Sequence, residues 1–330
     1  MDQPLLTVRD LRVTLSTARG PAEAVRGLDF SLDRGETLGI VGESGCGKSL
    51  TALALMGLLP DNGHAGGSVL FRNEDILRFD ERQMCDLRGN RLAMIFQEPM
   101  TSLNPLHRIG NQIAEPLQQH LKLSRRQAWE RAAELLDRVG IPNPRARLES
   151  YPHQLSGGQR QRVMIAIALA CDPDILIADE PTTALDVTIQ GQILDLIRKL
   201  VDDSGMALIL ISHDLGVIAE TVDRVLVMYA GRAVETGPVH EVFAGLRHPY
   251  ARGLFAAMPR LAPGLAYPRP RLPTIPGIVP DLLDLGTACA FAPRCVLAEP
   301  RCRGEFPPLV AVGPRHGAEC WRTDMTEERP

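Results

Sequence analysis

The chain of 330 residues lacks a long apolar run. Its longest continuous apolar stretch, Val163 to Cys171, is well short of the roughly 20 residues that a membrane-spanning helix needs. The first ten residues, MDQPLLTVRD, lack the basic and apolar regions of a secretory signal. We therefore expect a protein that stays in the cytosol. In that reducing compartment its seven cysteines favour free thiols or metal ligands over disulfides.

Lysine and aromatic residues are scarce. Only three of the 36 basic residues are lysines, at positions 48, 122 and 199, so a lysine within a motif carries weight. Aromatic residues make up 4% of the chain, and none precedes Phe30. The net charge of −4 argues against a general nucleic-acid binder, and we expect no nucleic-acid partner. The 45% of hydrophobic residues is sufficient for a buried core, which excludes a disordered chain.

Strand-like and helix-like segments alternate along the first 245 residues. Apolar and polar residues alternate over 5–15 and 25–32, as in half-buried strands. Further strands are expected at 37–41, 175–178, 207–212 and 224–231, and helices at 125–139, 160–171, 187–202 and from residue 50 to near Pro60. This alternation predicts a mostly parallel sheet with helices on its faces. The Arg-rich segment 125–165 interrupts it as a helical insertion.

The composition changes near residue 246. The segment 246–330 holds 14 of the 26 prolines, four of the seven cysteines and no lysine. Proline-rich stretches of this kind favour turns and extended segments. We therefore expect a C-terminal extension and not another alternating α/β unit.

Residues 42–49, GESGCGKS, fit the P-loop pattern GxxxxGK[ST] between an expected strand and an expected helix. Glycines allow the backbone to approach phosphates, and the helix N-terminus adds positive potential. Lys48 is expected to reach the β- and γ-phosphates and Ser49 to bind Mg²⁺. The expected ATP-binding residues are Gly42, Glu43, Ser44, Gly45, Cys46, Gly47, Lys48, Ser49 and Leu50.

Two acidic residues follow the apolar segment ILIA at 175–178. They fall where a parallel sheet presents its ligand-binding edge. Asp179 would hold Mg²⁺ through water, and Glu180 would polarise the attacking water. Acidic residues after a strand also cap helices, which is the alternative interpretation of this pair.

A third motif, LSGGQ, opens the expected helix at 160–171 and consists of Leu155, Ser156, Gly157, Gly158 and Gln159. Ser156 and Gln159 have the spacing of a capping box, so a plain helix cap is one interpretation. Paired glycines at a helix start also form an anion site. Because the P-loop already supplies one phosphate site, this second site could serve a phosphate elsewhere.

These motifs, with Gln97 in IFQEP, ALD at 184–186 and His213 in ISHD, occur in the order found in ABC transporter ATPases. The sequence resembles that family over about residues 5–245. The resemblance implies an α/β fold with a P-loop core, an antiparallel β-subdomain and a helical subdomain at about 90–165. It also implies two subunits that bind ATP head to tail between them.

The resemblance assigns further roles by position. Ser156 and Gly158 would contact the γ-phosphate bound to the partner subunit. Gln97 would sense Mg²⁺ and relay to the membrane subunit, and His213 would contact the γ-phosphate. Asp186 would lie at the subunit seam. The isolated alternatives are a surface amide for Gln97 and a helix-capping side chain for His213.

One departure from the family concerns adenine. The family usually places an aromatic ring under the base ahead of the P-loop, and that position falls near Leu15, where this chain has no aromatic residue. Adenine would then rest on aliphatic surface, on another segment or on a partner residue.

The C-terminal segment 246–330 resembles one group within this family. The stretches HPYARGLFAAMPRL (248–261), IPGIVPDLLDL (275–285) and CAFAPRC (289–295) are similar to the C-terminal region of ATPases in bacterial dipeptide and oligopeptide ABC importers. Nickel importers and some other importers share this region, so the ATPase of a nickel or other small-solute importer of the same family is the alternative function. The implied partners are a second, paralogous ATPase subunit, two permease subunits and an extracytoplasmic substrate-binding protein, with this chain on the cytoplasmic face of the inner membrane. A homodimer is the alternative assembly.

Three functions of other classes remain as alternatives. A soluble ABC ATPase acting on ribosomes or DNA usually has two ATPase units or a long coiled-coil insertion, and this chain shows neither. A P-loop kinase would not need LSGGQ. A module that binds ATP without hydrolysing it would not need Glu180.

Four cysteines in the tail, Cys289, Cys295, Cys302 and Cys320, have the spacing C-x5-C-x6-C-x17-C. Four thiolates could hold Zn²⁺ or an iron–sulfur cluster, or remain free thiols. Zinc sites favour short chelating pairs, which this tail lacks. The spacing is similar to that of peptide-importer ATPases whose tails bind a [4Fe–4S] cluster, so this cluster is the expectation and Zn²⁺ the runner-up. The neighbouring arginines 294, 301 and 303 could offset the thiolate charge.

A fifth cysteine, Cys46, lies within the P-loop. It lies beside Lys48 and at a helix N-terminus, both of which lower the pKa of a thiol. We therefore expect a reactive thiol that MgATP protects. The alternative is an inert buried thiol.

Overall fold

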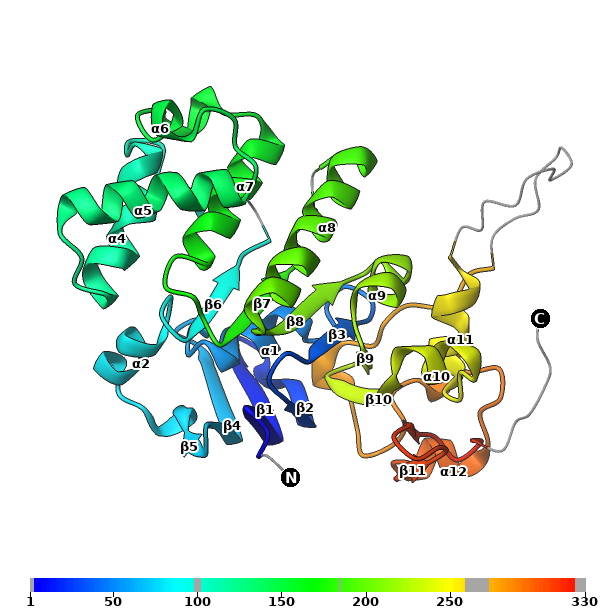
Figure 1. Ribbon diagram of the computed structural model, residues 1–330. Coiled ribbons are helices and arrows are strands. Elements are labelled where there is room, and N and C mark those ends of the chain that lie inside the picture. The colour runs from blue at the N-terminus through cyan, green and yellow to red at the C-terminus, as the bar shows by residue number, and fades with distance from the viewer. Residues whose placement is uncertain (1–2, 98–101, 184, 259–272, 324–330) are drawn as a thin grey trace, which may run out of the picture. The chain divides into compact units, whose positions relative to one another are not determined.

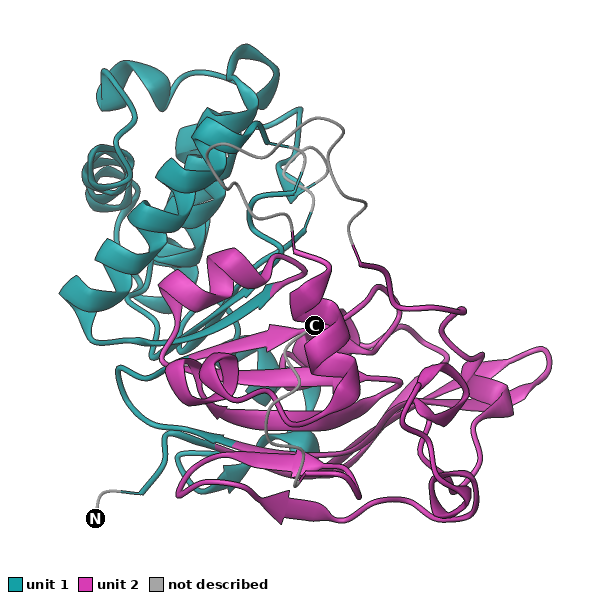
Figure 2. Ribbon diagram, turned by 90° about the vertical axis from the view of Figure 1, so that its right-hand side faces the viewer, with its two compact units in different colours: residues 1–6, 31–37, 70–211 teal, residues 7–30, 38–69, 212–330 magenta. Residues whose placement is uncertain are grey.

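The computed structural model describes residues 3–97, 102–183, 185–258 and 273–323 (Figure 1). The chain forms two compact units whose segments alternate along the sequence (Figure 2). The first comprises residues 1–6, 31–37 and 70–211, and the second comprises 7–30, 38–69 and 212–330. In these described stretches, no helix combines the length and apolarity that crossing a membrane requires.

The first unit contains a parallel sheet of three strands in the order β6-β7-β8. β6 (Leu92–Ile95), β7 (Ile175–Asp179) and β8 (Ala207–Ser212) run in the same direction, with Leu92 opposite Ile175 and Ile175 opposite Ala207. Every residue of β7 is buried, as expected for the continuous apolar run of a parallel strand. The strands predicted at 175–178 and 207–212 are thus confirmed.

Helices make up most of the rest of this unit. They are α2 (Glu81–Leu87), α4 (Ile109–His120), α5 (Arg125–Arg138), α6 (Pro144–Arg147), α7 (Gly157–Ala168) and α8 (Val187–Ser204), with a short strand β5 (Glu74–Asp75) and two 3₁₀ turns, η1 (Ile76–Arg78) and η2 (Pro152–Gln154). α5 starts with a capping box between Ser124 and Gln127. The helix predicted at 125–139 is confirmed, and Ala128, Ala132 and Leu136 on one of its faces are buried.

The second unit contains two groups of strands. β1 (Leu6–Thr17), β2 (Gly20–Leu32) and β4 (Gly63–Phe71) are ordered β2-β1-β4. Only two residues join β1 to β2, so these strands form an antiparallel hairpin. β3 (Thr37–Val41), β9 (Arg224–Tyr229), β10 (Arg232–Pro238), β12 (Gly317–Glu319) and β11 (Leu309–Ala311) follow the order β3-β9-β10-β12-β11. β3 and β9 are parallel, and the later pairs are antiparallel.

The helices of the second unit are short. They are α1 (Lys48–Leu55), α9 (Leu215–Thr221), α10 (Val239–Ala244), α11 (Pro249–Ala256) and α12 (Pro300–Gly304), with the 3₁₀ turns η3 (Leu282–Asp284) and η4 (Ala292–Arg294). The stretch ARGLFAAMPRL runs partly through α11, and its part from residue 259 on lies outside the described residues. The tail therefore contains short elements and turns, in keeping with its proline content.

Part of the tail is built into the sheet of the second unit. Ala318 of β12 pairs with Glu235 of β10, and Arg232 donates to both carboxylate oxygens of Glu319 at 2.9 and 3.1 Å. Glu235 is fully buried and lies 2.8 Å from Nε2 of His316. These contacts fix residues 316–319 on the edge of β10.

The predicted end of α1 near Pro60 is wrong, because the helix stops at Leu55. Gly57 has φ 60°, and its N–H donates to the carbonyl of Ala54 while the N–H of Leu58 donates to that of Leu53. This is the Schellman pattern, which ends helices at a left-handed glycine. The apolar residues after Gly57 continued the helical sequence pattern without continuing the helix.

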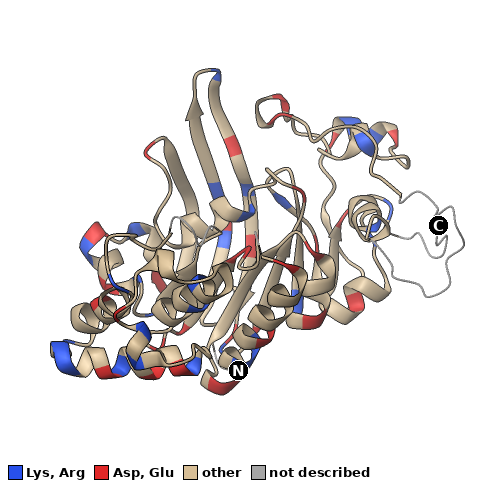
Figure 3. Ribbon diagram, turned by 90° about the horizontal axis from the view of Figure 1, so that it is seen from above, with Lys and Arg blue, Asp and Glu red and all other residues tan. Residues whose placement is uncertain are grey.

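Acidic and basic residues are interspersed along the described elements (Figure 3). Several pair on helix surfaces, as Arg126 does with Glu130 and Arg131 with Glu134. Exposed pairs of this kind each stabilise a fold by less than about 1 kcal/mol. Asp174 differs because its side chain is 8% exposed and both of its oxygens accept from Arg72 at 2.7 Å.

The packing of α4 on α5 generates a stability prediction. A Cβ at Gly110 would lie 2.5 Å from Cη2 of Trp129, so Gly110→Ala should lower the free energy of unfolding by about 1–3 kcal/mol. Gly191→Ala in α8 is the matched control, since no atom lies within 4 Å of its Cβ position, and it should stabilise by up to about 1 kcal/mol through helix propensity. Urea unfolding followed by circular dichroism measures both. Effects of the same sign would contradict this account.

Candidate functional site

The predicted P-loop connects β3 to α1 in the second unit. A Cβ at Gly42 would lie 2.3 Å from the carbonyl oxygen of Met228, and a Cβ at Gly47 would lie 2.6 Å from that of Ala24. Gly47 also has φ 99°, which disfavours any residue with a side chain. The loop thus runs so close to other backbone segments that only glycine fits at these two positions.

Lys48 is the first residue of α1 and is 6% exposed. Its Nζ donates to the carbonyl oxygens of Gly42 at 2.8 Å and Glu43 at 3.1 Å. Ser49 follows it in the first turn, and the hydroxyl of Thr51 donates to the carbonyl of Gly47 at 2.9 Å. The structure therefore brings the nine residues predicted to bind ATP into one loop and helix start.

The expected reactive character of Cys46 is wrong. Its side chain is 1% exposed, and burial raises the pKa of the thiol. The nearby charge of Lys48 acts in the opposite direction and is the smaller effect, with Nζ 3.9 Å from Sγ. Removal of the thiol from water therefore outweighs the positive charge on which the expectation depended.

Two residues predicted to act on water and Mg²⁺ lie together in the first unit. Nε2 of Gln97 donates to Oε2 of Glu180 at 3.1 Å, and Oγ1 of Thr183 donates to the same oxygen at 2.9 Å. Asp179, at the end of β7, is 4% exposed. Glu180 has φ 46°, a strained value for a residue with a side chain, and its N–H donates to the carbonyl of Ile211. Strain of this kind is concentrated at functional sites.

The predicted signature residues begin α7. Ser156 is its N-cap, and the reciprocal bonds with Gln159 at 3.2 and 3.3 Å form a capping box. The helix-cap interpretation is therefore realised, and anion binding here stays a prediction. A Cβ at Gly158 would lie 2.9 Å from Ile189 of α8. The N–H of Ile189 donates to Asp186, the N-cap of α8. Residue 184 of the ALD motif lies outside the described residues.

Two other predicted positions lie in the second unit. His213 is exposed and immediately precedes Asp214, the N-cap of α9. Leu15, near the expected adenine position, is in β1 and half-buried. No aromatic ring is supplied there by the strand itself.

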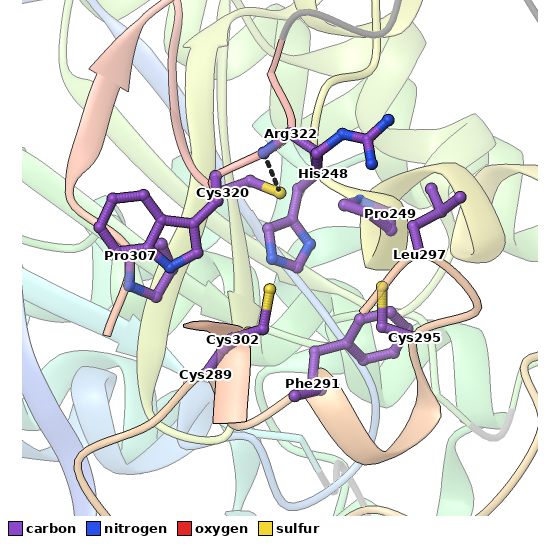
Figure 4. Close-up of a pocket in the computed structure, with 12 residues that line it drawn as sticks. His248, Pro249, Cys289, Phe291, Cys295, Leu297, Cys302, Pro307, Cys320 and Arg322 are labelled. Atoms are coloured by element: carbon purple, nitrogen blue, oxygen red, sulfur yellow. Dashed lines mark hydrogen bonds between the residues drawn. The ribbon is translucent and has the colours of Figure 1, made fainter. Parts of the chain in front are cut away.

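The four tail cysteines line one cavity, together with His248, Phe291 and Trp321 among others (Figure 4). Burial raises the pKa of Cys289 and Cys295, and that of Cys320 to about 11. Across the described part of the chain, no three His, Cys, Asp or Glu side chains are arranged to hold a single metal ion. The indole Nε1 of Trp321 is buried and has no hydrogen-bond partner among the described residues.

The expectation that Arg294 offsets thiolate charge is wrong. Its Nη1 and Nη2 donate to the two carboxylate oxygens of Glu43 in the P-loop, at 2.6 and 3.0 Å. Tyr250 also reaches the P-loop, because its hydroxyl oxygen accepts from the N–H of Glu43 at 2.8 Å. Sequence reasoning missed both contacts, although both residues lie in tail stretches that it had singled out, HPY and CAFAPRC.

His248 holds the start of α11, the helix that carries Tyr250. It is fully buried, and burial lowers the pKa of its imidazole to about 3. Its Nδ1 accepts from the backbone N–H of Tyr250 at 3.1 Å, and its backbone N–H donates to Oε2 of Glu235 at 2.8 Å. The neutral ring thus acts as the N-cap of α11, which carries Tyr250.

Comparison with family models defines the class. The model "ABC transporter" matches residues 25–183, and "Oligopeptide/dipeptide transporter, C-terminal region" matches residues 234–302. Among solved structures, the dimeric bacterial ABC transporter cassette MJ0796 is 27% identical with a TM-score of 0.64, covering 71% of this chain and 98% of that one. CbiO1 of Clostridium perfringens, part of a cbiONQ complex, is 30% identical with a TM-score of 0.63, covering 74% of this chain and 92% of that one.

Full-length relatives narrow the class. A Brucella melitensis protein named as a peptide import ATP-binding protein is 52% identical over 329 residues, which cover 97% of each chain. The oligopeptide transport ATP-binding proteins OppD of Salmonella typhimurium and Escherichia coli are each 51% identical, covering 96% of this chain and 93% of theirs. The chain belongs to the ABC transporter ATPases that carry the oligopeptide/dipeptide transporter C-terminal region. The resemblance inferred from the motifs is confirmed, as is the class of ATP-hydrolysing enzyme.

The environment of Cys46 predicts slow alkylation. On brief treatment with iodoacetamide at neutral pH, Cys46 should stay unlabelled with or without MgATP, because its thiol is buried and its pKa is raised. The exposed Cys85 is the internal control and should be labelled first. Mass spectrometry of the digested protein measures both sites. Rapid labelling of Cys46 that MgATP suppresses would contradict the burial seen here.

Proposed function

We propose that this chain hydrolyses ATP to power the import of di- or oligopeptides through a membrane ABC permease. The observation that carries the proposal is the presence of both family matches on one chain, at residues 25–183 and 234–302. The names of the full-length relatives support peptides as the cargo. The proposed partners are a second, paralogous ATPase subunit, two permease subunits and, through them, an extracytoplasmic binding protein. The chain would sit at the cytoplasmic face of the inner membrane.

The proposed domain division places the nucleotide-binding domain at residues 1–245. It includes a helical subdomain at about 90–165, which corresponds in sequence to α4 to α7, and an antiparallel β-subdomain based on the β1–β2 hairpin. The importer-type extension would comprise 246–330. The composition change at this boundary and the match from residue 234 support the division.

ATP binding is assigned to the P-loop, from Gly42 to Leu50. With no side chains at Gly42 and Gly47, the backbone of the loop can approach phosphates and donate to them from its N–H groups. Lys48, which donates to two P-loop carbonyls, can donate to phosphate oxygens instead. Ser49, Gln97 and Asp179 offer hydroxyl, amide and carboxylate oxygens, the hard ligands that suit Mg²⁺.

Hydrolysis is assigned to Glu180 as the group that accepts a proton from the attacking water. Its hydrogen bonds from Gln97 and Thr183 fix the carboxylate before water arrives. His213 would contact the γ-phosphate. In a head-to-tail dimer, residues 155–159 would bind the ATP of the partner subunit, and Asp186 would lie at the seam.

The four tail cysteines are assigned to a [4Fe–4S] cluster. The observation that supports this assignment is that all four cysteines line one cavity. The unpartnered indole N–H of Trp321 in the same lining is a donor that a sulfide or thiolate would accept. When bound, the cluster would cross-link a segment that has little regular structure.

Transport of peptides gives the central test. In cells that lack this gene, the wild-type chain should restore uptake of a labelled oligopeptide, and Glu180→Gln should not, because an amide cannot accept the proton. Purified Glu180→Gln should still bind ATP, whereas Lys48→Ala should bind it weakly.

Glu130→Gln on the exposed face of α5 is the matched control and should transport normally. Normal ATPase turnover by Glu180→Gln would remove Glu180 from its proposed role, and normal peptide uptake without the gene would argue against the cargo.

The metal content gives a second test. Protein purified without oxygen should be brown and contain about four irons and four sulfides per chain. Replacing Cys295 or Cys320 by Ser should abolish the colour, while Cys85→Ser, far along the chain from the tail, should keep it. Colourless protein with one zinc, or metal-free protein with four alkylatable tail thiols, would refute the cluster.

A further inference from the structure

Glu43, the second residue of the P-loop, is held by two residues from the tail. Both of its carboxylate oxygens accept from the guanidinium of Arg294, at 2.6 and 3.0 Å, and its backbone N–H donates to Tyr250. The side chain of Arg294 is 5% exposed and that of Glu43 is 26% exposed. A bidentate pair of this kind, largely removed from water, fixes both position and orientation. The tail therefore holds the P-loop through both its backbone and a side chain.

Arg294 is itself rigidly placed. Its Nε donates to the carbonyl of Pro276 at 2.9 Å, and its Nη1 also lies 3.3 Å from the hydroxyl of Tyr229. Gly277, with φ 77°, leaves room for the arginine stem, because a Cβ there would lie 3.2 Å from Cγ of Arg294. The guanidinium is thus positioned by the IPG turn, by β9 and by the P-loop together.

Tyr250 is equally fixed. It is fully buried. The centroid of its ring lies 4.6 Å from the ring centroid of Tyr229 and 5.5 Å from that of Phe291. Phe291 lines the cysteine cavity and is the N-cap of η4, the turn that contains Arg294. The aromatic rings therefore join the two tail residues that contact Glu43 into one packed cluster.

Glu43 stands next to the group that is to bind phosphate. Its carbonyl oxygen, like that of Gly42, accepts from Nζ of Lys48. A free carboxylate at this place would repel the negative charges of a triphosphate. Pairing with Arg294 neutralises that carboxylate and keeps the loop in one conformation, which lowers the ordering cost of binding.

We propose that Arg294 and Tyr250 are positioning residues for nucleotide binding, acting through Glu43, so that the affinity of the P-loop for ATP depends on the docked C-terminal segment. The inference rests on the proposed role of the P-loop. It adds to that role a dependence on residues outside the ATPase motifs. Neither Arg294 nor Tyr250 needs to touch the nucleotide.

The test measures the equilibrium binding of labelled ATP to the full-length chain, with Glu180→Gln present throughout to prevent turnover. Arg294→Met should raise the Kd by on the order of tenfold, a usual coupling between contacting residues. Arg294→Lys keeps the charge without the bidentate geometry and should recover part of the affinity. Tyr250→Phe removes only the acceptor for the Glu43 N–H and should weaken binding by about threefold, the effect of one lost hydrogen bond.

Arg301→Met is the matched control. Arg301 also lies beside a tail cysteine, Cys302, but its partners are in the tail, where it pairs with Glu299 at 2.9 Å and donates to the carbonyl of Trp321 at 3.4 Å. Its replacement should change the Kd less than twofold. A larger effect would mean that any disturbance of the tail weakens binding, which would overturn the specific role of Arg294.

A double-mutant cycle separates positioning from folding. In a Glu43→Gln background, Arg294→Met should have less than a third of its effect in the parent, because the carboxylate that it pairs with is gone. An undiminished effect, or wild-type binding by Arg294→Met, would overturn the proposal. If Arg294→Met does not fold, Tyr250→Phe and Arg294→Lys decide, and wild-type affinity in both would overturn it. Lys48→Ala tests the proposed role of the P-loop separately. If this variant still bound ATP tightly, the assignment of ATP binding to the P-loop would be refuted, whatever the role of Arg294.

Discussion

The absence of space around the P-loop is the constraint on which the candidate site depends. Side chains at Gly42 and Gly47 would overlap the backbone carbonyls of Met228 and Ala24. These carbonyls belong to β9 and β2, so a sheet strand and a hairpin strand together define the path of the loop. Because packed backbone cannot move aside as a flexible side chain can, the loop is placed by the fold and not by its own sequence alone.

The tail is linked to this region by polar contacts as well as by packing. Glu235 of β10 is fully buried and lies within hydrogen-bond distance of His316 and of the backbone N–H groups of Arg247 and His248. A carboxylate is stable in such a place only when its oxygens are satisfied. The same group therefore connects the strand of the ATPase sheet, the start of α11 and the segment that leads into β12.

Local patterns were predictable from the sequence, and long-range ones were not. The P-loop and β7 were predicted because each is specified by a few consecutive residues in a recognisable context. The end of α1 was not, because it depends on the left-handed backbone of Gly57 and on the bonds that Gly57 and Leu58 donate to Ala54 and Leu53, which hydropathy does not report. The reactivity of Cys46 was misjudged because burial depends on neighbours from other segments. The partner of Arg294 is 251 residues away in sequence, and no spacing rule reaches that far.

Because the chain is synthesised from its N-terminus, the two partners of the Arg294–Glu43 pair are made at very different times. The ribosome releases the P-loop early and supplies Arg294 251 positions later, followed by the strands that seat the tail on β10. A nascent chain therefore has its glycine-rich loop long before the acidic residue in it is neutralised. Such a chain would hold ATP poorly until it is nearly complete. Unfinished or C-terminally truncated subunits would then compete little for nucleotide with the finished protein.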